Sequence, residues 1–389
     1  MTLILSTLLL TLVAADLAAE AAAPCLRPSR AGTQVQGEVR ICPGRYRIAD
    51  PSERGVIVAA SSGTRIDLTG VVLESGDSVP ARFTGIGVAS KDVDAVSILG
   101  GTIRGYRIGL RLEGGHRHRV SGTDVSGSRA AALRSTATRP DTGDRLDPFR
   151  LAALTDAGAG LVLVRTAGAS ITGVAANAAQ HGIGLIDARG SYLADNQVTG
   201  NSGWGISLWG SSRNVVIRNR LQYTARCAPP TVDCHASAIL LREGSDSNTI
   251  ADNDLTASST GLRILGQPPL TRPSIGNLIF RNDASGSGVG FAAGHSWNLT
   301  LLENRSDSAA FGFRLDHLNG SVVRGNTVIG SRIAAIALEH GSDNAIEANV
   351  LLGGRVGLMV TAPAKGGGPS RGHRIDDNVV GGVEQGILL

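Results

Sequence analysis

The chain has 389 residues, of which 42% are hydrophobic, only 3% are aromatic and 52 are glycine. This hydrophobic fraction is too high, and the net charge of +4 too small, for a disordered chain. So few aromatic residues argue against an aromatic-rich β-sandwich. No run of basic residues and no basic stripe interleaved with aromatic residues occurs, so nucleic acid is not expected as a partner.

The first 23 residues have the pattern of an export signal. The apolar stretch 3–15 is too short to span a bilayer, and small residues follow it. We expect a signal peptide over 1–23, cleaved after Ala15 or Ala23. No other segment is long and apolar enough to cross a membrane, so the protein is expected in the periplasm or outside the cell.

The four cysteines fall into two local pairs. In an exported protein they predict two disulfides that close short loops, Cys25 with Cys42 and Cys227 with Cys234. The alternative, four free thiols in a cytosolic protein, is disfavoured by the export signal. A zinc site is disfavoured because no CxxC motif occurs.

A short phrase, an aliphatic residue followed three positions later by Asn, recurs at intervals of 22 to 34 residues. The asparagines of this phrase are Asn196, Asn219, Asn253, Asn282, Asn304, Asn326, Asn349 and Asn378. Each unit also contains a short strand that begins with Gly or Ala and alternates with a period of two, as in 205–208 and 312–315. These features predict coils of three short strands, with the asparagines in an internal ladder that pairs buried polar groups.

This repeat resembles that of the right-handed parallel β-helix, the pectate-lyase-like superfamily, and especially its parallel β-helix repeat members. Those members include mannuronan epimerases and the copper-maturation proteins of nitrous-oxide reductase. The resemblance covers residues 40–389 and implies an all-β, single-stranded right-handed parallel β-helix. We expect about twelve coils with 22–23-residue repeats over 55–389 and an N-terminal cap over 24–54. Insertions are expected near 137–158, 224–236, 267–274 and 362–371.

Aligning the coils on the Gly-led strand predicts one polar patch. His295, His317 and His340 form a column at the strand end, beside a column that contains Asp316 and Glu339. A histidine beside carboxylates can act as general acid or base, and an arginine can hold a substrate carboxylate. The candidate catalytic residues are therefore Arg314, Asp316, His317, Glu339 and His340, with His295 as a substrate-binding residue. Two alternatives stay open, a metal site and an ordinary solvated face.

The segment 137–158 interrupts the repeat and supplies the candidate substrate-binding residues Asp144, Asp147 and Arg150. Asp147-Pro148 resembles the start of the Asp-Pro-His-Asp motif of mannuronan epimerases. Phe149 stands in the His position and Arg150 in the second Asp position, so the epimerase assignment is not carried over. A decorated surface loop is the alternative. The segment is expected about seven coils, roughly 35 Å, from the histidine column, so that the two would mark the ends of a groove for a polymer.

Trp209 aligns on the outward side beside Arg242, where an exposed indole could stack on a sugar ring. Packing in the core or under a cap is the alternative. Arg242 and Arg263 complete the candidate substrate-binding set.

Three functions follow as hypotheses. The first is binding or modification of an acidic polysaccharide by β-elimination or epimerisation, with Arg314 holding the uronate. The second is a non-catalytic surface or adhesion solenoid. The third is periplasmic metal delivery through the histidine column, as in the copper-maturation relatives. A monomer that binds an acidic polysaccharide is expected; calcium is left open as a cofactor, and no organic cofactor is expected.

Overall fold

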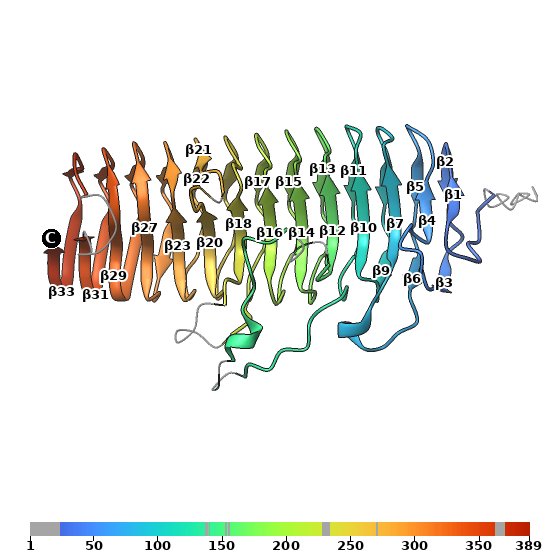
Figure 1. Ribbon diagram of the computed structural model, residues 1–389, viewed down its shortest axis with the longest axis horizontal. Helices are drawn as coiled ribbons and strands as arrows, with labels where there is room; N and C mark the ends of the chain where they lie inside the picture. Colours follow the sequence, from blue (N-terminus) through green and yellow to red (C-terminus); the bar gives the residue numbers. More distant parts are fainter. Residues whose placement is uncertain are drawn as a thin grey trace, which may run out of the picture.

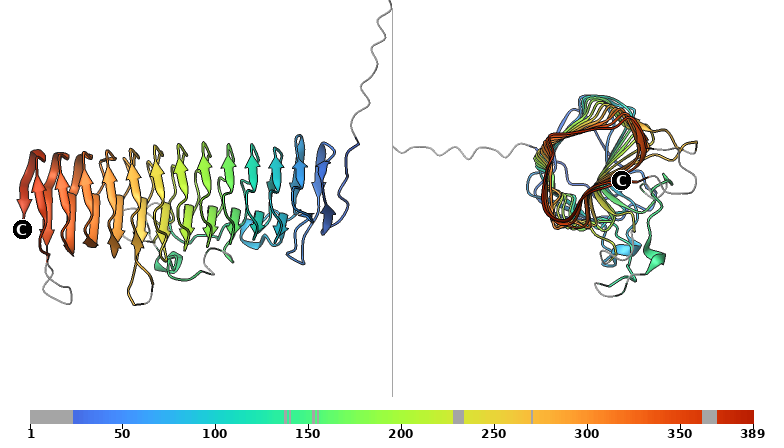
Figure 2. Two further views of the ribbon diagram at one scale, coloured as in Figure 1. Left: turned by 90° about the horizontal axis from the view of Figure 1, so that it is seen from above. Right: turned by 90° about the vertical axis from the view of Figure 1, so that its left-hand side faces the viewer.

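The computed structural model describes residues 24–136, 139, 141–151, 154, 156–227, 234–269, 271–361 and 370–389. The predicted signal peptide over 1–23 lies outside these ranges, as do parts of each predicted insertion. The described chain winds into a long right-handed solenoid whose coils stack along one axis (Figure 1). Seen from its end, successive coils superimpose around a common cross-section (Figure 2). The fold predicted from the repeat is confirmed.

The described strands pair in parallel throughout and form three sheets. The large sheet contains β1 (Thr33–Val35), β4 (Ile57–Ala59), β7 (Ile86–Lys91), β10 (Ile108–Glu113), β12 (Ala159–Val164), β14 (His181–Ile186), β16 (Trp204–Trp209), β18 (Ser237–Arg242), β20 (Thr260–Leu265), β21 (Ser274–Ile275), β23 (Val289–Gly294), β24 (Ser296–Trp297), β26 (Arg305–Asp307), β27 (Phe311–Asn319), β29 (Thr327–Ser342), β31 (Val350–Thr361) and β33 (Val379–Leu388). The narrow sheet contains β2 (Glu38–Arg40), β5 (Arg65–Asp67), β8 (Ser97–Leu99), β11 (Arg119–Ser121), β13 (Ser170–Thr172), β15 (Tyr192–Ala194), β17 (Val215–Ile217), β19 (Thr249–Ala251), β22 (Leu278–Phe280), β25 (Thr300–Leu302), β28 (Val322–Arg324), β30 (Ala345–Glu347) and β32 (Arg374–Asp376). The third sheet contains β3 (Gly44–Arg47), β6 (Val71–Glu74) and β9 (Thr102–Arg104), and two 3-10 turns span Pro80–Arg82 and Thr142–Asp144.

The narrow sheet contributes one strand to each coil, so its thirteen strands correspond to thirteen coils in the described part of the chain. About twelve coils were expected from the repeat. The segment 24–54, expected to be a cap, contributes the first of them. Its strands β1, β2 and β3 pair in parallel with β4, β5 and β6 of the next coil. Parallel backbone pairing needs no asparagine, so a coil can form where the repeat phrase is absent.

The core is built from inward aliphatic side chains that stack in register along the axis. In the narrow sheet Leu193, Val216, Ile250 and Ile279 lie directly above one another, and all four are fully buried. Each such side chain contributes about 1.5–3 kcal/mol of hydrophobic free energy. The glycine that opens the second strand permits close approach to the next coil. A Cβ on Gly312 would lie 2.6 Å from the carbonyl oxygen of Ala335.

The predicted asparagine ladder is confirmed from Asn196 to Asn378. At its centre, Asn219 donates from Nδ2 to Oδ1 of Asn253 at 3.0 Å, and Asn253 donates in the same way to Asn282 at 2.9 Å. Asn253 Nδ2 also reaches the carbonyl oxygen of Val216 at 2.9 Å. Each rung therefore pairs backbone groups that would otherwise be buried without a partner.

A second ladder, which the repeat phrase did not reveal, lies one turn away. Asn214 donates to Asn248 at 3.0 Å, and Asn248 donates to Asn277 at 3.0 Å. Its sequence signal is an asparagine two positions before the inward aliphatic residue, as in Asn214 before Val216. Both turns that flank the narrow sheet thus carry stacked amides.

Both predicted disulfides are confirmed. Cys25–Cys42 ties the start of the described chain to the first coil, and Cys227–Cys234 closes an excursion between β17 and β18. None of the helices in the described ranges has the length and apolar character that a membrane crossing needs.

We expect Asn253→Ala to lower the free energy of unfolding by about 3 kcal/mol, because it leaves buried amide and carbonyl groups of adjacent coils unpaired. The matched control is Asn378→Ala at the last rung, which removes fewer buried bonds and should cost clearly less. Chemical denaturation of both variants measures the difference. Equal losses at the two rungs would contradict a role for the ladder in pairing buried groups.

Candidate functional site

The three histidines of the predicted column lie on adjacent coils with their rings stacked. The ring centroids of His295 and His317 are 4.2 Å apart, and those of His317 and His340 are 4.5 Å apart. The three residues have left-handed backbone angles, with φ of 49°, 51° and 57°. Histidine is one of the few non-glycine residue types enriched in that conformation. The stacking predicted from the repeat register is therefore present.

Asp316 binds two of these histidines at once. Nδ1 of His317 lies 2.7 Å and Nδ1 of His340 lies 3.1 Å from the same oxygen, Asp316 Oδ1. An ionised carboxylate only accepts hydrogen bonds, so Nδ1 of each ring carries the proton that it donates. In the neutral form of each ring the lone pair is then on Nε2.

The two rings differ in their access to solvent. The side chain of His317 is 33% exposed, whereas that of His340 is only 10% exposed. Nε2 of His340 is buried and has no hydrogen-bond partner among the described residues. A buried acceptor without a partner carries a free-energy cost that a bound ligand could remove.

The charge state of His295 is set by its surroundings. Burial lowers the pKa of His295, and the neighbouring His317 lowers it further against the opposing effect of Asp316. The ring of His295 therefore stays neutral below the pH at which a free histidine becomes protonated.

Arg314 and Glu339 lie beside the histidines, on the outer side of the large sheet. The side chain of Arg314 is 51% exposed, and its Nη2 is 3.8 Å from Oε2 of Glu339. The structure thus brings together His295 and the five residues predicted as catalytic, as the register required.

The segment 141–151 does not line an open groove but covers part of the large sheet. The chain that leads into it, residues 126–136, runs along the outside of the coils from the end of β11 toward β18 (Figure 1). Leu146 and Leu154 pack with outward apolar side chains, including Trp204, Trp209 and Leu240, in a second hydrophobic cluster outside the solenoid. We call this covering segment, residues 141–151 together with Leu154, the roof.

The expectation of an exposed Trp209 indole is therefore wrong. Trp209 is 8% exposed, and the guanidinium carbon of Arg242 lies 3.8 Å from its ring centroid. The ring centroid of Phe149 also lies 5.0 Å from the guanidinium carbon of Arg242. Because the roof and Trp209 enclose it, Arg242 is only 1% exposed and not available to a ligand in this conformation.

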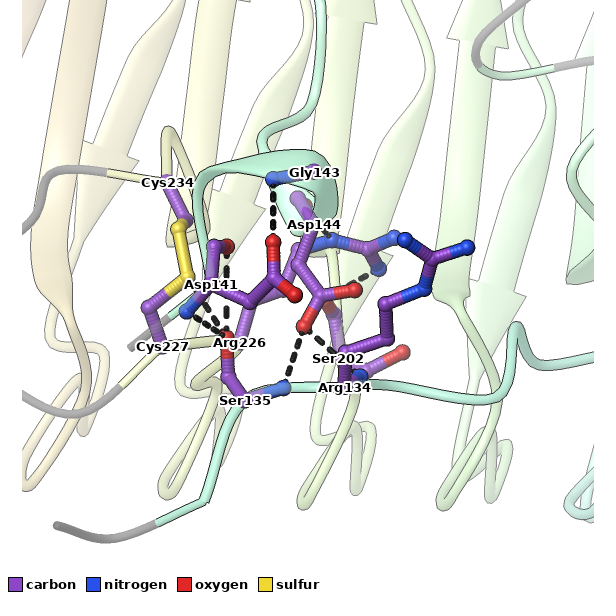
Figure 3. The surroundings of a disulfide bond; sticks show 9 residues. All are labelled: Arg134, Ser135, Asp141, Gly143, Asp144, Ser202, Arg226, Cys227 and Cys234. Carbon is purple, nitrogen blue, oxygen red and sulfur yellow. Dashed lines mark hydrogen bonds between the residues drawn. A yellow bond between two sulfur atoms is a disulfide. The ribbon is translucent and has the colours of Figure 1, made fainter. Parts of the chain in front are cut away.

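Two more predicted substrate-binding residues are buried. Arg263 is 7% exposed and donates to the hydroxyl of Thr260 at 2.8 Å. Asp144 is 5% exposed, and its Oδ2 accepts hydrogen bonds from the backbone N–H groups of Arg134 and Ser135 at 2.9 and 2.6 Å (Figure 3). Asp147 and Arg150, in contrast, are exposed as expected.

Asp144 holds the roof to the loop that the second disulfide closes. Arg226 donates to the carbonyl oxygen of Asp144 (Figure 3). Leu146 N–H donates to the carbonyl oxygen of Cys234 at 3.2 Å. Burial opposes ionisation of Asp144, but the hydrogen bonds from Ser135 and Arg134 and the charge of Arg226 keep its pKa below the usual value. This carboxylate has a structural role.

The expected separation of about seven coils between the roof and the histidine column is also wrong. Phe149 lies over Arg242 in β18, and only β20 and β23 stand between β18 and β27. Three strand spacings correspond to about 14 Å. The repeat register identifies the coil from which the insertion departs, but not the direction in which the insertion extends along the solenoid.

The exposed tryptophan is Trp297, which is not among the predicted site residues. Its side chain is 43% exposed, and it pairs in register with Asn319 two residues after the histidine column. Trp204, by contrast, is fully buried and stacks on His181 at 4.5 Å. The sequence contains one signal for its location, because Trp297 follows His295 by two positions and therefore lies next to the histidine column.

A family model described as "Periplasmic copper-binding protein (NosD)" matches residues 46–285 and 271–389. The chain belongs to this family. The NosD family is described as periplasmic and the chain has two disulfides, so this NosD-family chain is an exported protein. No curated protein matches it.

Solved structures similar to this NosD-family chain share its fold. An A-module of a mannuronan C-5 epimerase from Azotobacter vinelandii is 13% identical with a TM-score of 0.55, over 91% of this chain and 87% of that one. A mutant tailspike protein of the E. coli bacteriophage HK620, in complex with a pentasaccharide, is 11% identical with a TM-score of 0.60, over 90% of this chain and 61% of that one. At such identities the likeness establishes the β-helix alone.

We expect Asp144→Ala to loosen the roof, since two backbone N–H groups lose their acceptor at a cost of about 1–3 kcal/mol. Acrylamide quenching of tryptophan fluorescence should then reach a larger fraction of the emission, because Trp204 and Trp209 lie beneath the roof. Arg150→Ala, which truncates an exposed side chain in the same segment, should leave quenching unchanged. If the two variants are quenched equally, the structural role of Asp144 is refuted.

Proposed function

We propose that this protein binds a transition-metal ion, copper above all, in the periplasm through His317 and His340, with Asp316 orienting both rings. The observation that carries the proposal is the shared carboxylate. One ligand atom from each of the three residues lies within 4.8 Å of the others, and Asp316 fixes both rings by their Nδ1 atoms. The copper-binding description of the family agrees with this choice.

The residues fit such an ion. A carboxylate on Nδ1 orients a histidine so that Nε2 can bind a metal, and this arrangement recurs at metal sites. Nε2 of His340 is buried and unpaired in the described part of the chain. A metal ligand must be deprotonated, and this nitrogen carries the lone pair of the neutral ring.

The donor set selects among metals. Imidazole suits copper, zinc and nickel, and affinity along the divalent series is greatest for Cu²⁺. The cluster contains no thiolate or thioether, the ligands that select Cu(I). We therefore infer that the site takes the cupric ion, which it would hold by imidazole nitrogens with carboxylate support.

Titration of the purified protein with Cu²⁺ should give one tight site, and binding should weaken as the pH falls because protons compete for the imidazoles. Asp316→Asn should weaken binding about 10- to 100-fold, the usual effect of losing the group that orients a ligand. The double variant His317→Ala, His340→Ala should lose the site.

The matched control is His116→Ala. His116 also pairs with an aspartate, since its Nδ1 lies 2.8 Å from Asp94 Oδ1, but it has no second histidine on that carboxylate. This variant should bind Cu²⁺ like the parent. Calorimetry and electron paramagnetic resonance measure the binding, and a site that survives in the double variant would refute the assignment.

A second candidate function is binding of an acidic polysaccharide, supported by the exposed indole of Trp297 and the exposed guanidinium of Arg314 beside the histidines. An indole face can stack on a sugar ring, and a guanidinium can hold a uronate carboxylate. If the site is catalytic, His317 would remove the proton next to the carboxylate through Nε2, which is the step common to β-elimination and epimerisation. Binding without this step would make the protein an adhesion solenoid.

This candidate predicts line broadening of a uronate polysaccharide in proton NMR spectra when the protein is added. A new alkene signal would indicate a lyase, and altered anomeric ratios without chain shortening an epimerase. Arg314→Gln should reduce the broadening, whereas Arg324→Gln, an exposed arginine of the narrow sheet, should not. Sharp lines with every uronate polymer would eliminate the candidate.

A further inference from the structure

A cavity of about 630 Å³ lies at the edge of the solenoid that carries the histidine column, several coils nearer the N-terminus. Its lining includes His116, Arg165, Thr166, Asp187 and Arg189. Arg165 directly follows β12 and Asp187 directly follows β14, as His295 follows β23. From β14 to β23 the large sheet advances four strands, or about 19 Å. The cavity is therefore separate from the copper site.

The charges that line this cavity are only partly paired. Arg165 donates one hydrogen bond to Glu113, a carboxylate that already has Arg111 as a second partner. A guanidinium has five N–H donors, so most of those of Arg165 remain for another acceptor. His116 pairs with Asp94. Arg189 and Asp187 have no side-chain hydrogen bond or ion pair within the described part of the chain.

The unpaired residues carry opposite charges yet do not bind one another. Arg165 and Arg189 offer planar, bidentate donors that match a carboxylate. Asp187 offers only acceptors, which suit hydroxyl groups. A ligand that combines a carboxylate with hydroxyl donors satisfies both.

We propose that this cavity binds the carboxylate-bearing ring of an acidic sugar, with Arg165 and Arg189 on the carboxylate and Asp187 on ring hydroxyls. The cavity volume falls within the range of about 300–1,000 Å³ typical of small-molecule sites. The proposal deepens the polysaccharide candidate, because it gives a uronate chain an anchor on the same edge as Trp297, and it does not depend on metal binding.

The test is saturation-transfer NMR of the full chain with D-glucuronate. Two further probes are D-glucose, which lacks the carboxylate, and acetate, which lacks the ring hydroxyl groups. Glucuronate should bind, and glucose and acetate should each bind at least about tenfold more weakly, the effect of losing a charge-assisted hydrogen bond. Arg189→Gln and Arg165→Gln should each lower glucuronate affinity by a similar factor. Both side chains are exposed, so the variants should fold.

Two controls separate this proposal from the others. Arg324→Gln should leave glucuronate binding unchanged, and the His317→Ala, His340→Ala protein should keep it while losing copper. Glucuronate binding that is equal in the parent, Arg165→Gln and Arg189→Gln proteins would overturn the proposal. Acetate bound as tightly as glucuronate would also overturn it, since the cavity would then be a general anion site.

Discussion

The solenoid of this protein depends on the parallel hydrogen bonding of each coil to the next. Adjacent strands lie about 4.8 Å apart, so residues at equivalent positions become direct neighbours. Repetition of one side-chain type along a column is therefore stabilising, because like side chains on adjacent coils contact one another. It produces the aliphatic stacks of the core and the asparagine ladders of the turns, and at the end of the large sheet it stacks the rings of His295, His317 and His340.

The same geometry explains what could be predicted from the sequence. The repeat phrase fixes the register, and the register alone places His317 next to His340 and both next to Asp316. It also predicts that Trp209 and Arg242 are neighbours, which they are. Side-chain contacts between coils therefore follow from counting residues, and this covers the fold, the ladder and the histidine cluster.

The misjudged residues are those whose environment depends on an insertion. An insertion obeys no register, so its path is set by contacts such as Leu146 with the outer apolar cluster and Asp144 with backbone N–H groups. These contacts bury Trp209 and Arg242, which the register correctly placed on the outward side. The exposed indole lies instead at Trp297, beyond the reach of the roof.

The histidine–aspartate cluster at one edge of this exported β-helix supplies the ligand atoms for the proposed binding of copper. The most direct test is crystallography of the protein soaked in Cu²⁺, with anomalous difference maps calculated from data at the copper absorption edge. The account predicts one strong peak bonded to imidazole nitrogens of His317 and His340, with Asp316 in contact with the site. A map without density there, or with its only copper peak at other residues, would contradict it.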